Sequence, residues 1–186
     1  MLFSFFQPIE YKGKLVTDIL RNYRAYFNAI IGDYNINTYY IQGSPRPEQV
    51  AYELYGNPQL YWLLFMLNDV YDPFYDWITD QESAYQAAEQ RYKGLGGNQV
   101  LYHVDEHGEK YWNLVEYPVG SGNWYDKGDE HHRHLQFQGA LAAVDIYEDA
   151  ILQNEKRRKI KVLDPSQVKH FINAFVRQME AADVHV

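Results

Sequence analysis

The sequence predicts an α+β fold, in which a small strand–helix–helix–strand core carries flanking helices, a β-hairpin and an extended N-terminal arm. The core occupies residues 38–79, and its parts are a β-type run, two helices and a second β-type run, at residues 38–41, 47–55, 59–68 and 75–78. Gly56 suits the end of the first helix because glycine adopts positive φ without strain. Asn57 and Pro58 then supply an N-cap and a first helical residue for the second helix. At roughly forty residues, such a unit is marginal alone.

The first 37 residues predict an arm followed by a helix. Residues 1–14 show no regular period, and Phe3, Phe5 and Phe6 form an apolar cluster within them. Large apolar side chains are costly to leave in water, so we expect these rings to dock on this protein or on a neighbour. Apolar residues near 3.6-residue spacing then predict a helix that begins at Thr17 and stops at Gly32.

The third part of the chain, residues 80–186, predicts a helix, a β-hairpin, an aromatic loop and C-terminal helices. Thr79 or Asp80 can cap the first of these helices. The later segments are strands at 99–104 and 110–117, a loop at 118–129, a helix at 140–159, a strand-like run at 160–163 and a last helix after Asp164-Pro165. Trp124 and Tyr125 lie inside the predicted loop, where exposed aromatic side chains are candidates for partner contacts.

Composition narrows the classes of function. The net charge of −8 argues against a nucleic-acid backbone as the main partner, and the lack of cysteine excludes disulfides and thiolate metal sites. The longest apolar run, residues 60–67, is far shorter than the roughly 20 residues of a membrane span. We therefore expect a soluble protein, and its N-terminus lacks the pattern of a secretory signal. Tyrosine supplies 18 residues, which is typical either of a surface buried by partners or of a tyrosine-rich core.

The sequence contains no recognisable catalytic constellation, so we predict a non-enzymatic protein without a cofactor. A dense polar run consists of Asp129, Glu130, His131, His132, Arg133 and His134. Such side chains can bind a divalent metal, but no helical spacing fixes their geometry, and a solvated polar loop is the favoured interpretation. Paired carboxylates for glycoside hydrolysis arise by chance in a chain with 25 acidic residues. The patterns of a nucleophile elbow, a phosphate loop and a dinucleotide site are missing.

Several features of the core carry a first resemblance. They are residues 39–41, Gly43-Ser44, Val50-Ala51, residues 54–58, residues 60–62 and Asn68 before Asp72-Pro73. Together they make the core similar to a lysin motif, a fold that binds glycans containing N-acetylglucosamine between its two turns. The resemblance implies groove positions at Ser44, Pro45, Arg46, Asn68, Asp69 and Tyr71. Pro45 and Pro47 depart from the motif because they stiffen the first turn, so we expect the groove to be vestigial.

Segments spread over nearly the whole chain carry a second resemblance. They are residues 5–11, 39–48, 55–62, 77–79, 124–129, 139–145 and 154–156. The chain is thereby similar to the small baseplate wedge subunit with a lysin-motif-like domain found in contractile-tailed, T-even-type bacteriophages. Matches spread this widely are more specific than any single motif. The histidine cluster at 131–134 is not a feature of that family, which further weakens the metal interpretation.

The second resemblance implies a structural subunit that joins baseplate wedges to one another and around the central hub and tube. Its expected partners are other wedge proteins and hub or tube proteins, without nucleic acid or membrane, in six copies or a multiple per baseplate. The expected location is the tail baseplate of the virion, after assembly in the host cytoplasm. The predicted partner-interface residues are Phe3, Phe5, Phe6, Trp124 and Tyr125. The alternatives are a peptidoglycan-binding lysin-motif module and, as a third class that we do not expect, a wall-degrading enzyme.

Overall fold

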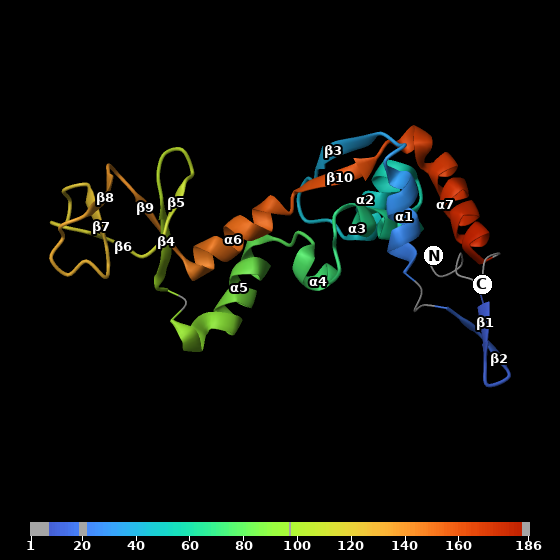
Figure 1. Cartoon of the computed structure of the whole chain (residues 1–186), viewed down its shortest axis with the longest axis horizontal. Helices are drawn as coiled ribbons and strands as arrows, with labels where there is room; N and C mark the ends of the chain where they lie inside the picture. The colour runs from blue at the N-terminus through green and yellow to red at the C-terminus, as the bar shows by residue number, and fades with distance from the viewer. Residues whose placement is uncertain (1–7, 19–21, 97, 184–186) are drawn as a thin grey trace. The chain divides into compact units, whose positions relative to one another are not determined.

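The computed structural model describes residues 8–18, 22–96 and 98–183 of the 186-residue chain. The chain forms two compact units (Figure 1). The core unit comprises Met1–Ile78 and Arg157–Val186, and the inserted unit, Thr79–Lys156, separates these two parts in sequence. Helices and strands occur in both units, which confirms the predicted α+β class.

The core unit takes its elements from both ends of the chain. They are β1 (Pro8–Tyr11), β2 (Lys14–Thr17), α1 (Tyr23–Ile31), β3 (Ile36–Tyr40), α2 (Pro47–Tyr55), η2 (Pro58–Leu60), α3 (Tyr61–Leu67), α4 (Pro73–Asp76), β10 (Lys159–Leu163), η4 (Pro165–Gln167) and α7 (Val168–Asp183). The two central helices are confirmed, and the Asn57 side chain accepts a hydrogen bond from Gln59 N–H at 2.9 Å, as an N-cap should. The helix predicted from Thr17 begins only at Tyr23, where the Asn22 side chain caps it.

The strand that pairs with β3 comes from the far end of the sequence. β10 runs antiparallel to β3, with Ile36 opposite Leu163. The prediction of a second strand at residues 75–78 is therefore wrong. Asp72 accepts a hydrogen bond from Phe74 N–H at 3.0 Å, and the intervening proline has a φ suited to a first helical turn, so this stretch starts the short helix α4.

An apolar layer packs beneath the β3–β10 pair, against α2 and α3. Its buried residues are Ile41, Val50, Ala51, Leu64, Trp77, Ile78, Ile160 and Val162. The two β10 members alternate with exposed lysines, as expected of a strand with one covered face. Tyr55 accepts a hydrogen bond from Leu163 N–H at 3.1 Å, and burial raises the pKa of its phenol to about 12.

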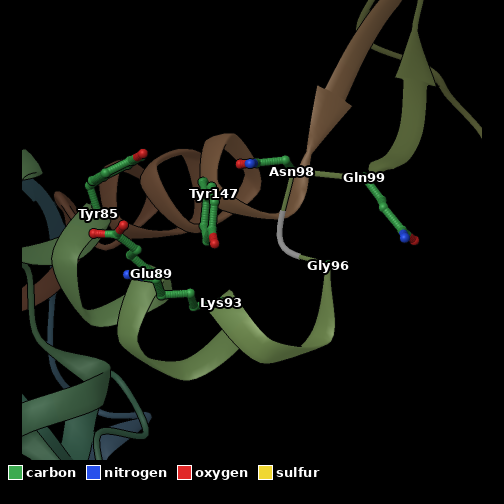
Figure 2. Close-up of a pocket in the computed structure, with 7 residues that line it drawn as sticks. All are labelled: Tyr85, Glu89, Lys93, Gly96, Asn98, Gln99 and Tyr147. Atoms are coloured by element: carbon green, nitrogen blue, oxygen red, sulfur yellow. The ribbon is translucent and has the colours of Figure 1, made fainter.

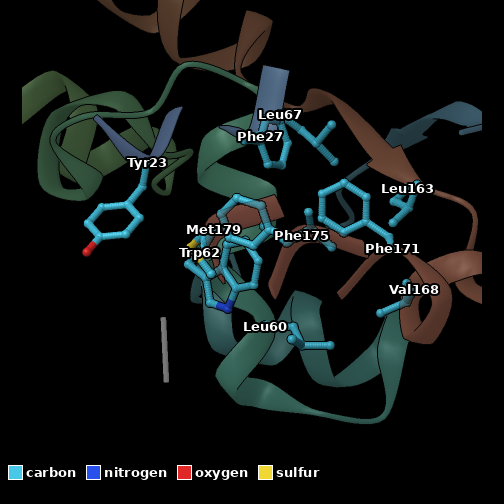
Figure 3. Packing of buried hydrophobic residues seen from close by; sticks show 11 residues of the cluster. Tyr23, Phe27, Leu60, Trp62, Leu67, Leu163, Val168, Phe171, Phe175 and Met179 are labelled. Atoms are coloured by element: carbon cyan, nitrogen blue, oxygen red, sulfur yellow. The ribbon is translucent and has the colours of Figure 1, made fainter. Parts of the chain in front are cut away.

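A second apolar cluster joins α1, α3 and α7. The residues that α7 contributes recur at helical spacing and are Val168, Phe171, Phe175 and Met179. Figure 3 shows the rings of Trp62, Phe27, Phe171 and Phe175 gathered together. Phe175 stacks on Trp62 with 5.8 Å between the ring centroids. Phe27 of α1 meets Phe175 edge-on at 6.2 Å. Each of these buried rings therefore has aromatic partners from a different helix.

Residues 8–17, which include part of the predicted arm, form a β-hairpin. Ile9 pairs with Val16 across β1 and β2. Lys12 and Gly13 have φ values of 51° and 73°, which is the positive-φ pair that a tight two-residue hairpin turn requires. Lysine is not a residue that this turn favours, so the sequence gives only a weak turn signal here.

In its described residues, the inserted unit has two α-helices, a short 3-10 helix and two small antiparallel sheets. Its elements are α5 (Gln81–Tyr92), η3 (Lys93–Leu95), β4 (Val100–Val104), β5 (Lys110–Tyr111), β6 (Leu114–Glu116), β7 (Asn123–Asp126), β8 (Leu135–Gln138), β9 (Ala142–Asp145) and α6 (Ile146–Lys156). The sheets have the strand orders β5-β4-β9 and β6-β7-β8. In the described ranges of the chain, no helix is both long and apolar enough to cross a membrane.

The inserted unit departs from the sequence prediction in its strands. The run predicted as one strand at 110–117 is divided between β5 and β6, because Asn113 has a positive φ of 59°. The predicted loop at 118–129 contains the strand β7. The helix predicted from residue 140 begins at Ile146, because β9 first pairs with β4.

The Asn154 side chain links the beginning of the inserted unit to its end by hydrogen bonds. The side chain is fully buried, accepts a hydrogen bond from Thr79 N–H at 3.0 Å and donates one to Thr79 C=O at 2.7 Å. Because these residues lie near the first and last positions of the unit, a single side chain closes its chain path. Buried amides of this kind stabilise only when both ends are bonded.

Candidate interaction surfaces

Three of the predicted groove positions already interact with other residues of the core unit. They are Asn68, Asp69 and Tyr71. The Asn68 side chain donates to Lys161 C=O at 2.8 Å and accepts from Lys161 N–H at 2.7 Å, so it pairs with the edge of β10 as another strand would. Asp69 forms an ion pair with Arg24. The Arg24 guanidinium also lies 5.4 Å from the centroid of the Tyr71 ring. The Asn68 amide is therefore occupied by β10, and the vestigial character of the groove at these positions stays a prediction.

The first turn of the core holds the remaining predicted groove positions, Ser44, Pro45 and Arg46. Contacts from distant segments fix this turn. The Trp77 indole N–H donates to Pro45 C=O at 2.9 Å, and Arg158 donates to Gly43 C=O at 2.9 Å. Two hydrogen bonds from other segments therefore hold the backbone of this turn, in agreement with the stiffness expected from its prolines.

Residues 71–76, which include the short helix α4, make up a segment that we call the aromatic turn. Its three large side chains are strongly exposed: Tyr71 at 74%, Phe74 at 86% and Tyr75 at 57%. Exposed apolar groups that lie together on a surface mark contact sites more often than isolated ones do. Sequence reasoning missed Phe74 and Tyr75 because it assigned the second of them to a strand. The signal that could have found them is the Asp-Pro helix start directly before two aromatic residues.

Carboxylates hold the backbone of the aromatic turn. Asp76 accepts hydrogen bonds from the N–H groups of Tyr71 and Asp72, at 3.3 Å and 3.1 Å. Asp72 in turn accepts from Phe74 N–H. The exposed rings therefore project from an ordered backbone.

Neighbouring residues of β7 lie on opposite faces of the sheet β6-β7-β8. Trp124 is only 8% exposed, its indole N–H donates to Gly139 C=O at 2.9 Å, and its ring centroid lies 4.6 Å from that of His103. Tyr125 is half-buried on the other face. Trp124 thus belongs to the interior of the inserted unit, and we retain Tyr125 as the candidate for partner contact.

The face of this sheet that carries Tyr125 is called the sheet face below. Val115 and Leu135 lie directly opposite Tyr125 on β6 and β8, and both are exposed. The His132 ring stacks on Tyr117 with centroids 4.0 Å apart and meets Tyr125 edge-on at 5.3 Å. A row of exposed aliphatic and aromatic side chains is typical of the central part of an interface. Sequence reasoning placed only Tyr125 here, because a glycine-rich loop signal hid the strand period.

The polar run at 129–134 forms a turn around one carboxylate. Asp129 accepts hydrogen bonds from His134 N–H and Arg133 N–H, each at 2.8 Å, and these bonds, led by that from His134, lower the pKa of the Asp129 carboxyl. Throughout the residues that the structure describes, no three histidine or acidic side chains are grouped closely enough to hold a metal ion. The metal interpretation therefore gains no support from the geometry.

A hollow of about 310 Å3 lies beside α5 and α6 in the inserted unit (Figure 2). Its lining residues are Tyr85, Glu89, Lys93, Gly96, Asn98, Gln99 and Tyr147. Tyr85 and Tyr147 meet edge-on at 5.4 Å. Burial and the nearby Glu89 carboxylate raise the pKa of Tyr147, which keeps its phenol protonated. The lining brings together no activated nucleophile with a base, so it provides no catalytic arrangement.

The predicted anchors Phe3, Phe5 and Phe6 lie outside the described residues. The hairpin that follows them exposes the apolar side chains Ile9, Tyr11, Leu15 and Val16. A lone two-stranded hairpin is at best marginally stable in water. The hairpin is therefore a third candidate contact surface of the chain.

Comparison with known proteins accords with a role in assembly. Residues 1–178 match the model of a protein family described as base plate wedge protein 53. The "Baseplate wedge protein gp53" of Enterobacteria phage T4 is 54% identical over 189 aligned residues, which cover 97% of this chain and 96% of that relative. Both the extent of the family match and the level of identity show common ancestry over almost the entire length. The chain therefore belongs to the base plate wedge protein 53 family.

Proposed function

We propose that this protein is a structural, non-enzymatic subunit that joins baseplate wedges to one another and helps to close six of them around the central hub and tube. Membership of the family makes it a baseplate wedge protein, a virion tail-baseplate component that associates with other baseplate components. A joining role requires more: the subunit must contact at least two neighbours through different surfaces.

Exposed apolar surfaces on two separate units are the observation that carries this proposal. The aromatic turn belongs to the core unit, and the sheet face belongs to the inserted unit. Permanent assemblies bury on the order of 2,000 Å² or more per interface, and aromatic anchors contribute much of the binding energy. One surface on each unit allows a single chain to hold two neighbours.

We also propose that β3, α2, α3 and β10 form a lysin-motif-like unit whose second strand follows the inserted unit. The order strand, helix, helix, strand supports this interpretation. The Asn68 side chain, at a groove position, instead pairs with the backbone of Lys161 in β10. The family match gives no support to the alternative of a peptidoglycan-binding module. Retention of the purified protein on peptidoglycan would revive that alternative, and we expect none.

Sedimentation of reconstituted mixtures tests the joining role. The purified remaining wedge components of the same phage would be mixed with and without this protein, and the products separated by size. We expect individual wedges without it and closed rings with it. Rings that form equally well in its absence would refute the proposal. A protein that sediments with single wedges but closes no ring would be a wedge component without a joining role.

A further inference from the structure

We propose that the aromatic turn inserts into an apolar hollow rimmed by lysine or arginine side chains on a neighbouring baseplate protein. This inference rests on the proposed function, because it names the chemistry of one partner surface. It begins from exposure: Tyr71, Phe74 and Tyr75 are at least half exposed, and Phe74 is almost wholly so. Apolar rings displayed in this way become buried only through a partner.

The turn is prepared for binding before a partner arrives. The carboxylates of Asp72 and Asp76 accept hydrogen bonds from three backbone N–H groups inside the turn. On its C-terminal side, Trp77 is buried, donates its indole N–H to Pro45 C=O and packs edge-on against Phe65 at 5.9 Å. A rigid loop loses little conformational entropy on association. The backbone that carries Phe74 is therefore held in place before a partner binds.

The charges around the rings define the partner. Asp69, Asp72 and Asp76 are interspersed with the aromatic residues along the chain. Arg24 offsets one of these three charges through its ion pair with Asp69 and also contacts the Tyr71 ring. The surface therefore combines exposed apolar rings with net negative charge. A docking surface of matching chemistry has an apolar hollow and a positive rim, because like charges across an interface are costly.

A protein partner fits these observations better than a sugar. Carbohydrate binding needs polar groups that are free to bond with hydroxyls, in addition to flat rings. Here the Asn68 amide and the Asp72 and Asp76 carboxylates already bond to the protein's own backbone. What the turn offers outward is chiefly apolar ring surface and net negative charge.

The test measures how tightly variants bind the purified wedge components of the same phage. Phe74→Ala should weaken binding by about tenfold or more, as loss of a buried aromatic anchor does. Tyr52→Ala is the matched control, because Tyr52 is a 64% exposed aromatic residue of the same unit that lies outside the turn. We expect it to bind like the unaltered protein. Unchanged thermal unfolding of both variants would show that the fold is intact.

A second variant tests the charges without disturbing the backbone. The double substitution Asp72→Asn and Asp76→Asn removes two negative charges, keeps an oxygen acceptor at each position and leaves the Asp69–Arg24 ion pair in place; asparagine also suits the helix cap at residue 72. We expect it to weaken binding at low salt and to flatten the salt dependence between about 50 and 500 mM.

The outcomes separate this inference from the proposed function. If the unaltered protein assembles and Phe74→Ala assembles equally well, the inference is overturned while the joining role stands. If the unaltered protein binds no wedge component, both are overturned. Self-association of the isolated protein that Phe74→Ala abolishes would identify a second copy as the occupant. Binding of N-acetylglucosamine oligomers that is lost in the same variant would identify a sugar. Either result would overturn the inference of a basic-rimmed protein hollow.

Discussion

The core unit and the inserted unit are stabilised in different ways. Both extended clusters of buried apolar residues among the described residues lie in the core unit. The buried polar residues of the described ranges, His103 and Asn154, both lie in the inserted unit. Apolar packing does not depend on pH, and it tolerates apolar substitutions that keep the side-chain volume. A buried polar group, by contrast, depends on each of its hydrogen-bond partners being present. The core unit therefore depends chiefly on apolar packing, whereas the inserted unit combines buried apolar residues with buried polar groups.

The largest effect is expected from a cavity in the core unit. Phe175 is fully buried and has Phe27, Trp62 and Phe171 as ring neighbours. Phe175→Ala should lower the free energy of unfolding by about 3–5 kcal/mol, measured by denaturant titration. The exposed Phe74→Ala is the control and should change it by less than about 0.5 kcal/mol. Equal effects of the two would contradict the description of the core unit as packing-dominated.

A smaller but more localised effect is expected from Asn154→Leu. Leucine has a similar size but leaves Thr79 N–H and C=O without their bonds to Asn154, and the loss should be about 2–3 kcal/mol. Hydrogen exchange should accelerate within Thr79–Lys156 and remain unchanged in β3 and β10. Gln153→Leu is the control, because Gln153 is only half-buried and bonds Asp149. Uniform acceleration in both units would mean that they do not unfold separately.

The sheet β6-β7-β8 allows a buried and a partly exposed aromatic residue to be compared within one unit. Trp124→Phe removes the hydrogen bond to Gly139 and part of a buried ring, so we expect a loss of about 1–2 kcal/mol. Tyr125→Phe, on the opposite face, should leave the free energy of unfolding nearly unchanged. Binding to wedge components should show the opposite pattern. Tyr125→Ala should weaken it, whereas Trp124→Phe should leave it nearly unchanged. A stable Trp124→Phe variant with weakened assembly would instead restore Trp124 as a partner anchor.

The sequence predicts those parts of the fold whose signals are local. Asn57 and Pro58 mark a helix start by their own chemistry, and the structure has a helix there. The strand that pairs with β3 has no such local signal, because Ile36 pairs with Leu163 and the whole inserted unit separates these two residues in sequence. No local pattern specifies which of two apolar runs will pair with a strand, so residues 75–78 were a plausible but incorrect choice.

The candidate surfaces are predictable to a similar extent. Aromatic residues in a predicted loop drew attention to Trp124 and Tyr125, but only the period of two along β7 separates the buried Trp124 ring from the face that carries Tyr125. Phe74 escaped notice because its exposure depends on tertiary context: α4 ends before Trp77, which turns inward to contact Pro45. Exposure of an aromatic residue is set by the path of the chain rather than by composition.

The smallest effect expected is a pH dependence confined to the inserted unit. His103 is 8% exposed, and its Nδ1 has no hydrogen-bond partner within the part of the chain that the structure describes. Burial, with a smaller contribution from Lys127, lowers the pKa of His103. The unfolded chain therefore takes up a proton at a higher pH, about 6.5, than the folded protein does. Acidification from pH 7 to pH 5 should then reduce the free energy of unfolding.

Paired histidine variants isolate this contribution. His103→Gln should flatten the decline in stability between about pH 7 and 5, whereas His107→Gln, which alters a strongly exposed histidine on the neighbouring turn, should preserve it. Hydrogen exchange at both pH values should place the change in β4 and β7, where His103 meets Trp124. Because the core unit has no buried histidine among its described residues, its exchange should show no matching pH response. A parallel response in β3 and β10, which contain no histidine, would mean that the two units are stabilised alike, and the distinction between them would fail.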